Sequence, residues 1–369
     1  MKQIKVNIEE RSIRKLRKFF ALLQVKYLIE SPLISVVMSA YNASITLKEA
    51  IDSILSQTFI DLEFLIVNDA STDDTEKIIL SYLDERIVYL KNTENKGLVY
   101  SLNKAIKMAK GKYIARLDAD DISCHNRLSL QYTFMEKHPE VDICGTWMYQ
   151  FAENRFKRKV ISPILDKDIK AFLLFKNPIF HPSVLMRKDI FDSISGYDSE
   201  DYRQEDLGLW INSVNAEKVF FNIPIPLIYY RYSPNSESNI GKNNLKCYSV
   251  IRTRIIGRLL NDLAINDETK SIISTLTSSV LIKECSLIFV KENIKKLFLL
   301  LGVVKGVNKV SLRRALAYHL LVIVSIRPAI IKHFSIFMQN AIWVDMVIMA
   351  LYYSLLKFIP GRLLVRFYL

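Results

Sequence analysis

The sequence lacks both of the common glycine-rich turns that bind phosphate groups through backbone amides. No GxGxxG follows the first apolar segment, residues 33–38, and no GxxxxGK[ST] occurs anywhere in the 369 residues. The first absence argues against a dinucleotide site of the Rossmann type, and the second argues against a P-loop. A phosphate-containing ligand would therefore have to be held by side chains and a metal ion.

Cysteine is also scarce, and no CxxC or other metal-binding spacing occurs among Cys124, Cys144, Cys247 and Cys285. We therefore expect reduced thiols. The N-terminus has no uninterrupted apolar segment followed by small residues, so we expect no cleavable signal peptide. Together these features predict a cytoplasmic protein.

The net charge of +13 is unevenly distributed along the chain. Residues 1–30 and 241–369 carry net charges of +5 and +13, whereas residues 31–240 carry −5. Both basic regions are rich in large apolar side chains, which fits an anionic membrane surface better than a nucleic-acid groove. We expect peripheral association with the inner face of the cell membrane and no binding to nucleic acid.

Helices are predicted in both terminal regions. Residues 11–28 place apolar side chains at helical spacing between Lys and Arg, which predicts a basic amphipathic helix on a bilayer or against the body. From residue 245 onward the chain has few Gly or Pro and reads as helical. Residues 341–359 are nearly long enough to span a bilayer but contain Asp345. An interfacial helical region is favoured over a soluble helical domain and over a true span.

Between these regions, short apolar strands alternate with amphipathic helices. Strands are predicted at residues 33–38, 64–67 and 87–90, and a capping-box pair, Thr46 and Glu49, is predicted to begin the first helix. Such repeats predict an α/β domain over residues 31–240, with a doubly wound, mostly parallel sheet and helices on both faces. Ligands of such sheets bind beyond the carboxyl ends of the strands.

The most informative segment is residues 111–121, GKYIARLDADD. A glycine that is expected to end a helix precedes a short strand and three carboxylates, Asp118, Asp120 and Asp121. Acidic groups this close repel one another unless a cation lies among them, and Mg²⁺ or Mn²⁺ prefers oxygen ligands and substrate phosphates. The segment predicts a metal-diphosphate site. The alternative is a solvated turn that caps the next helix.

Further polar groups in the second half of this domain admit two interpretations each. His181 is either a structural histidine or a contact to metal or diphosphate. Glu205 and Asp206 begin a predicted helix, where a carboxylate can cap the helix or accept a proton from a hydroxyl. Arg231 ends a strand and can clamp a phosphate or pair with a surface acid.

Seven motifs in this order resemble the bacterial family 2 glycosyltransferases of the GT-A fold, across residues 33–240. They are residues 39–42 (SAYN), 67–73 (VNDASTD), 95–97 (NKG), 117–121 (LDADD), the His181-Pro182 segment, 204–206 (QED) and Tyr230-Arg231. The resemblance implies a surface-polysaccharide enzyme that transfers a sugar with inversion. The donor would be a nucleotide sugar, with a UDP-sugar expected, and the acceptor a hydroxyl of a glycan or lipid-linked glycan.

The resemblance also implies which residues contact the donor: Ala40, Tyr41, Asn42, Asp69, Asp118 and Arg231. Asp69 would contact the nucleotide base. Asp118 would bind the ribose or the sugar, and Arg231 would steady the departing diphosphate.

Catalysis and metal binding are implied for other residues. Asp120 would hold Mn²⁺ or Mg²⁺, and His181 is a further candidate ligand. Asp206 would be the general base, with Glu205 as the alternative.

Two other functions are compatible with a related fold. A sugar-1-phosphate nucleotidyltransferase needs a glycine-rich loop after the first strand, and residues 39–42 contain no glycine. A non-catalytic carbohydrate-binding or scaffold protein would not require both Asp120 and Asp206, so their joint presence argues against it.

Overall fold

The computed structural model describes residues 32–152, 158–232, 245–260, 266–279, 281–283, 285–293, 296–297 and 308–326. The helix predicted at residues 11–28 and the apolar segment 341–359 lie outside the described residues. The strands are β1 (Ile34–Ala40), β2 (Leu62–Asn68), β3 (Ile87–Lys91), β4 (Tyr113–Arg116), β5 (Ile122–Ser123), β6 (Ile143–Phe151), β7 (Arg158–Val160), β8 (Leu185–Arg187) and β9 (Phe220–Arg231). The helices are α2 (Leu47–Leu55), α3 (Thr75–Leu80), α4 (Leu98–Met108), α5 (Arg127–Lys137), α6 (Asp166–Phe172), α7 (Ile190–Ser193), α8 (Glu205–Asn215), α10 (Leu245–Leu260), α11 (Asp267–Leu276), α12 (Leu287–Asn293) and α13 (Lys309–Ile326), with short 3₁₀ turns η1 (His181–Ser183), η2 (Ser199–Asp201) and η3 (Leu281–Lys283).

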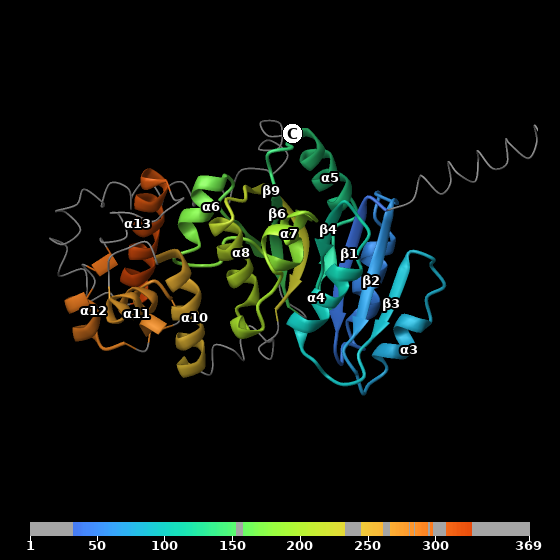
Figure 1. Ribbon diagram of the computed structural model, residues 1–369, viewed down its shortest axis with the longest axis horizontal. Helices are drawn as coiled ribbons and strands as arrows, with labels where there is room; N and C mark the ends of the chain where they lie inside the picture. Colours follow the sequence, from blue (N-terminus) through green and yellow to red (C-terminus); the bar gives the residue numbers. More distant parts are fainter. Residues whose placement is uncertain are drawn as a thin grey trace, which may run out of the picture.

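One sheet passes through the middle of the described chain (Figure 1). Its strand order is β3-β2-β1-β4-β8-β6-β9-β5, with β7 paired to β6. The strands from β3 to β4 are parallel, as are β6 and β9, whereas β8 runs antiparallel to both β4 and β6. The predicted α/β fold is confirmed, and its first half is the parallel half.

The direction of strand addition reverses between β1 and β4. The chain runs outward from β1 to β2 and β3, and then returns across both strands to form β4 on the other side of β1. Right-handed crossovers therefore place α2 and α3 on one face of the sheet and α4 on the other. Such a reversal opens a crevice beyond the carboxyl ends of the strands, where ligands bind in open α/β sheets.

The strands of the parallel half are nearly continuous apolar segments because both of their faces are covered. Every residue of β2 is buried, including Glu63. The Glu63 carboxylate accepts hydrogen bonds of 2.6 Å from the Ser35 hydroxyl and from the Lys110 amide. A buried charge is tolerated only with such partners, so this network joins the amino ends of β1 and β2 to the chain that enters β4.

Gly111 is part of the same network, and its role differs from the predicted one. Helix α4 ends at Met108 with Ala109 as its C-cap, so Gly111 does not end the helix. Instead its amide donates a hydrogen bond of 2.7 Å to the Ser35 hydroxyl, and a Cβ at this position would lie 2.5 Å from the Ser35 amide nitrogen. Glycine is required here because two backbones approach closely.

Helices that follow residue 245 gather at the end of the molecule away from β3 (Figure 1). Helix α10 packs against α8 and α13 packs against α6, so they cover the second half of the α/β body. This agrees with the predicted helical C-terminal region. No helix among the described residues has both the length and the apolar content needed to cross a bilayer.

Replacing Gly111 with alanine tests the close approach to β1. We expect Gly111→Ala to lower the free energy of unfolding by about 1–3 kcal/mol, because the added methyl group collides with backbone that cannot rotate away. Urea denaturation measures the change. Gly257→Ala in α10 is the control, since nothing lies within 4 Å of its added Cβ, and it should be neutral or stabilising. Equal stability of the two variants would contradict this account.

Candidate active site

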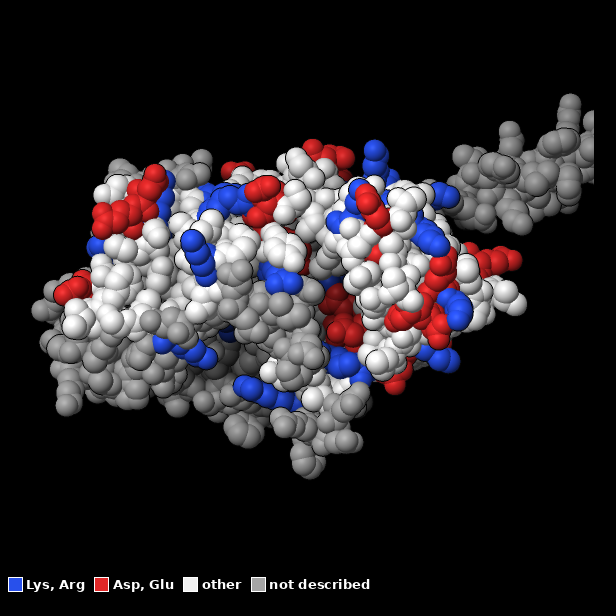
Figure 2. Space-filling model, turned by 90° about the horizontal axis from the view of Figure 1, so that it is seen from below, with Lys and Arg blue, Asp and Glu red and all other residues white. Residues whose placement is uncertain are grey.

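The loops that follow β1, β2 and β4 meet at the carboxyl edge of the parallel strands, as predicted. Asn42 accepts a hydrogen bond of 2.9 Å from the Thr72 amide through Oδ1, and its own amide donates to the Ser71 hydroxyl at 3.0 Å. Thr46 donates from Oγ1 to the carbonyl of Ala119 at 3.0 Å. In Figure 2, acidic side chains gather in a hollow of the face seen from below.

Strained backbone marks the first two of these loops. Asn42 and Ala70 have positive φ angles of 47° and 58°, a conformation that is uncommon for residues other than glycine. Between them, the Asp69 amide donates to the Ala40 carbonyl at 2.9 Å. The β1 and β2 loops are therefore held in one defined arrangement, and Tyr41 at its rim is half exposed.

Asp69 lies beneath this rim and is almost fully buried. Its Oδ1 accepts hydrogen bonds from Asn92 Nδ2 at 2.7 Å and from the Lys96 amide at 2.9 Å, while Oδ2 accepts from the Gly97 amide at 2.8 Å. Asp69 thus organises the loop between β3 and α4. Its contact to a nucleotide base stays a prediction.

Three carboxylates form the acidic cluster: Asp118, Asp120 and Asp121. One oxygen from each lies within 4.8 Å of the others. Asp121 is fully buried; its Oδ1 accepts a hydrogen bond of 2.8 Å from the Arg231 amide, and its Oδ2 has no hydrogen-bond partner. A buried carboxylate oxygen without a partner is costly.

The electrostatics of the cluster favour a bound cation. Burial, together with the nearby Asp118 carboxylate, raises the pKa of Asp120 to about 6. The same causes raise the pKa of Asp121 well above its usual range. A hard divalent cation takes oxygen ligands and would relieve both the repulsion and the unpartnered oxygen, so the residues present fit Mn²⁺ or Mg²⁺.

Two arginines border the acidic cluster. Arg116, at the end of β4, is 3 % exposed and pairs with the Asp118 carboxylate. Arg231, at the end of β9, donates from Nε to the Asp120 carbonyl at 3.0 Å and pairs with Glu49 of α2. Arg231 is therefore fixed beside the acidic turn, and its contact to a departing diphosphate stays a prediction.

The capping box predicted at the start of α2 is not formed. Thr46 is the N-cap residue, but its side chain makes no capping hydrogen bond and instead reaches the Ala119 carbonyl. Glu49 pairs with Arg231. Both side chains instead bond to residues that are distant in the sequence.

Glu205 and Asp206 lie in the first turn of α8. Asp206 accepts a hydrogen bond from Asn177 Nδ2 through Oδ2 and one of 2.7 Å from the Leu207 amide through Oδ1. Burial raises the pKa of Asp206, and burial with the adjacent Asp206 charge raises the pKa of Glu205 to about 7. The helix therefore presents two carboxyl groups that are easier to protonate than usual.

The acidic cluster and the start of α8 influence each other electrostatically. The Arg116 guanidinium lowers, and the Asp118 carboxylate raises, the pKa values of both Glu205 and Asp206. Such mutual effects require the groups to lie close together. That Asp120 and Asp206 line one cleft stays a prediction.

His181 is nearly buried and contacts side chains of the protein interior. It is 7 % exposed, its Nε2 is 2.6 Å from the Tyr197 hydroxyl, and its ring meets Trp210 edge-on with centroids 6.0 Å apart. Burial lowers the pKa of His181 well below its usual range. Among the described residues, the candidate metal group contains only the three aspartates, so the metal role of His181 stays a prediction without a supporting contact.

Sequence reasoning missed two residues of the site. Arg116 stands in an otherwise apolar strand, and a charged residue there is a signal that a buried partner exists. Asn177, which orients Asp206, lies 29 positions away from it in the chain, and no local pattern indicates that pairing.

Comparisons with known proteins identify the family. Residues 35–195 match the profile of the family described as "Glycosyl transferase family 2". An uncharacterized glycosyltransferase of Methanocaldococcus jannaschii is 37% identical over 234 residues, covering 61% of this chain and 80% of the relative. The Escherichia coli enzyme WfaP, named as a UDP-Glc:α-D-GlcNAc-diphosphoundecaprenol β-1,3-glucosyltransferase, is 33% identical over 208 residues, covering 56% of this chain and 80% of that enzyme.

The fold also resembles that of a solved structure. Staphylococcus aureus TarS 1–349, crystallised with UDP-GlcNAc, superposes with a TM-score of 0.54 at 16% sequence identity, over 79% of this chain and 88% of that one. At this identity the likeness concerns the fold alone.

The raised pKa of Asp120 makes the effect of a divalent cation depend on pH. Protonation of Asp120 in the folded state stabilises the metal-free protein at low pH, and this contribution is lost as the pH rises through about 6. Mn²⁺ binds the ionised carboxylates. We expect its stabilising effect on thermal unfolding to grow between about pH 5 and about pH 8.

Differential scanning fluorimetry measures this effect, with Asp120→Asn as the comparison. The variant should lose most of the Mn²⁺-dependent shift in Tm. A shift that is equally large in the variant, or that is independent of pH, would contradict the assignment.

Proposed function

Because this chain belongs to glycosyl transferase family 2, we propose that it transfers a sugar from a nucleoside-diphosphate sugar to an acceptor hydroxyl with inversion at the anomeric carbon. The observation that carries the proposal is the position of Arg116. It pairs with Asp118 of the acidic cluster, and its charge also lowers the pKa of Asp206 at the start of α8.

The donor side of the proposed cleft is assigned to the carboxyl edge of the parallel strands. Asp69 and the loop of Ala40, Tyr41 and Asn42 would form the nucleotide pocket. Asp118 would contact the ribose or sugar, and Asp120 would hold Mn²⁺ or Mg²⁺. When bound, such an ion stabilises the negative charge on the leaving diphosphate, and Arg231 adds a fixed positive charge beside it.

The acceptor side is assigned to Asp206. As the acceptor oxygen bonds to the anomeric carbon, the bond to the diphosphate oxygen breaks and the hydroxyl proton moves to the Asp206 carboxylate. Asn177 and the Leu207 amide hold that carboxylate in one orientation. Direct displacement needs one base, and much of the remaining acceleration comes from positioning.

The substrate class follows from the relatives and from the sequence. WfaP is named for a UDP-sugar donor and a diphosphoundecaprenol-linked acceptor, which supports a UDP-sugar and a lipid-linked glycan for this chain. Such an acceptor lies at a membrane surface, and the basic, apolar terminal regions suit the inner face of the cell membrane. A cytoplasmic, peripherally associated enzyme meets both requirements.

Replacing the base tests the assignment directly. We expect Asp206→Asn to lower kcat by about 1,000-fold, because the acceptor hydroxyl loses its proton acceptor. Binding of the nucleotide sugar, measured by calorimetry with Mn²⁺, should stay near the wild-type value. The matched variant is Glu205→Gln, which should retain most of the transfer activity. Near-normal turnover by Asp206→Asn would overturn this role.

The pH dependence of kcat/KM separates the two adjacent carboxyl groups. The base must be ionised, so activity should fall as the pH is lowered. The pKa of Glu205 is about 7. If Glu205 were the base, kcat/KM would therefore decline as the pH falls through about 7, which is the acid limb of the profile. With Asp206 as the base, we expect the acid limb to persist in Glu205→Gln at saturating Mn²⁺. Its loss in that variant would assign the base to Glu205.

A further inference from the structure

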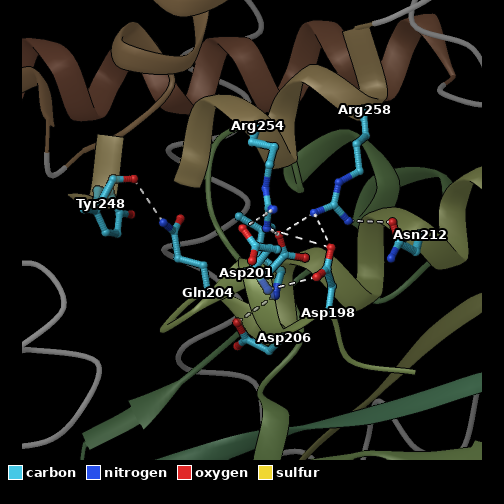
Figure 3. Close-up of polar contacts among 10 residues, drawn as sticks. Asp198, Asp201, Gln204, Asp206, Asn212, Tyr248, Arg254 and Arg258 are labelled. Atoms are coloured by element: carbon cyan, nitrogen blue, oxygen red, sulfur yellow. Dashed lines mark hydrogen bonds and ion pairs between the residues drawn. The ribbon is translucent and has the colours of Figure 1, made fainter. Parts of the chain in front are cut away.

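The segment that leads into α8 is anchored by a helix from the C-terminal region. Asp201, in the turn η2, is fully buried. Its Oδ1 accepts hydrogen bonds from the guanidinium groups of both Arg254 and Arg258, which lie one turn apart on α10 (Figure 3). Residues more than 50 positions downstream therefore hold the start of the helix that carries Asp206.

The opposite side of Asp201 is closed by α8 itself. A Cβ at Gly208 would lie 1.8 Å from Asp201 Oδ2, so only glycine lets the helix approach the carboxylate. The Asp201 carbonyl accepts a hydrogen bond of 2.7 Å from the Gln204 amide, and the Gln204 carbonyl accepts one of 3.0 Å from the Gly208 amide. Asp201 is thus tied to the first turn of α8 through the backbone.

Two more contacts join α10 to the same segment. Gln204 donates from Nε2 to the Tyr248 carbonyl at 3.1 Å, and Arg258 donates from Nη1 to Asn212 Oδ1 at 2.7 Å (Figure 3). Gln204 is the N-cap residue of α8 and the immediate neighbour of Glu205. Helix α10 therefore contacts α8 at its N-cap and again at Asn212.

The charges make this arrangement difficult to replace. Exposed ion pairs contribute little stability, but Asp201 is fully buried and Arg258 is only 20% exposed. Removal of the partners would leave a buried carboxylate unpaired, which a protein avoids by moving the group toward water. Such a movement would carry Gln204 and the first turn of α8 with it.

We propose that Arg254 and Arg258 are positioning residues for the transfer reaction. Through Asp201 they set the direction in which the Asp206 carboxylate meets the acceptor hydroxyl. This inference rests on the proposed function, and it makes α10 a part of the catalytic centre.

The first test compares steady-state kinetics of full-length variants. We expect the double variant Arg254→Gln/Arg258→Gln to lose about 10- to 100-fold in kcat, because small misplacements of a reacting group are costly. The KM for the nucleotide sugar should change by less than about twofold. Arg254→Lys/Arg258→Lys keeps both charges and should recover part of the loss.

The control is an arginine of similar burial in the parallel half. Arg86 is 25% exposed, pairs with Asp84 and lies away from α8, so Arg86→Gln should keep the wild-type kcat. If the double variant does not fold, the single variant Arg254→Gln replaces it, since Arg254 is 37% exposed. A wild-type kcat in these arginine variants would overturn the positioning role.

A second readout needs no substrate. Hydrogen-deuterium exchange of peptides that cover residues 198–210 should be faster in the double variant and unchanged in Arg86→Gln. Unchanged exchange in the double variant would overturn the anchoring itself. Absence of transfer by the wild-type protein with any nucleotide sugar would instead overturn the proposed function, so the two failures are distinguishable.

Discussion

The structure depends on how buried and half-buried carboxyl groups are compensated around one arginine. Asp118, Asp120 and Asp121 form the acidic cluster, Glu205 and Asp206 begin α8, and loss of solvation raises the pKa values of the last four. Arg116 pairs with Asp118 and is itself buried. Its strand is held in turn by Arg127, which donates hydrogen bonds of 2.9 Å to the carbonyls of Arg116 and Pro182. A buried charge without partners is costly, so the surrounding body is built to keep these charges in fixed positions, and that fixity is what a reaction centre requires.

The two halves of the sheet supply different parts of the site. The parallel half ends in the loops after β1, β2 and β4, which are joined to one another by side-chain hydrogen bonds. The second half supplies Arg231 at the end of β9 and the two carboxylates at the start of α8. Strand β8 runs antiparallel between β4 and β6 and connects the halves. The proposed donor-binding residues and the proposed base therefore come from separate structural units.

The helices after residue 245 extend this organisation beyond the residues that match the family profile. The family profile ends at residue 195, before the segment that contains Asp201 and Asp206. Helix α10 packs on α8 and places two arginines against the buried Asp201. Helix α13 packs on α6, where the Lys176 ammonium lies 4.8 Å from the centre of the Tyr318 ring. Although this region follows the α/β domain in the sequence, its helices therefore pack directly against that domain.

Local periodicity and residue type predict the fold class, the helical character after residue 245, the convergence of the loops and the acidic cluster of Asp118, Asp120 and Asp121. These features follow from short-range alternation of apolar and polar residues and from the rule that parallel strands end at one edge. The role of Asp206 as the base was implied only by the family resemblance, because a carboxylate at the start of a helix is also a typical cap. The partners of the individual side chains were decided only by the tertiary structure. Thr46 and Glu49 do not form the predicted capping box, because they bond to Ala119 and Arg231 instead. Gly111 is needed for a close approach to Ser35, and the His181 ring contacts the Tyr197 hydroxyl. Each of these contacts joins segments that are distant in sequence, except for the 16 positions between His181 and Tyr197. A polar side chain takes the strongest partner that the packed chain brings within reach, and local sequence does not specify which partner that is.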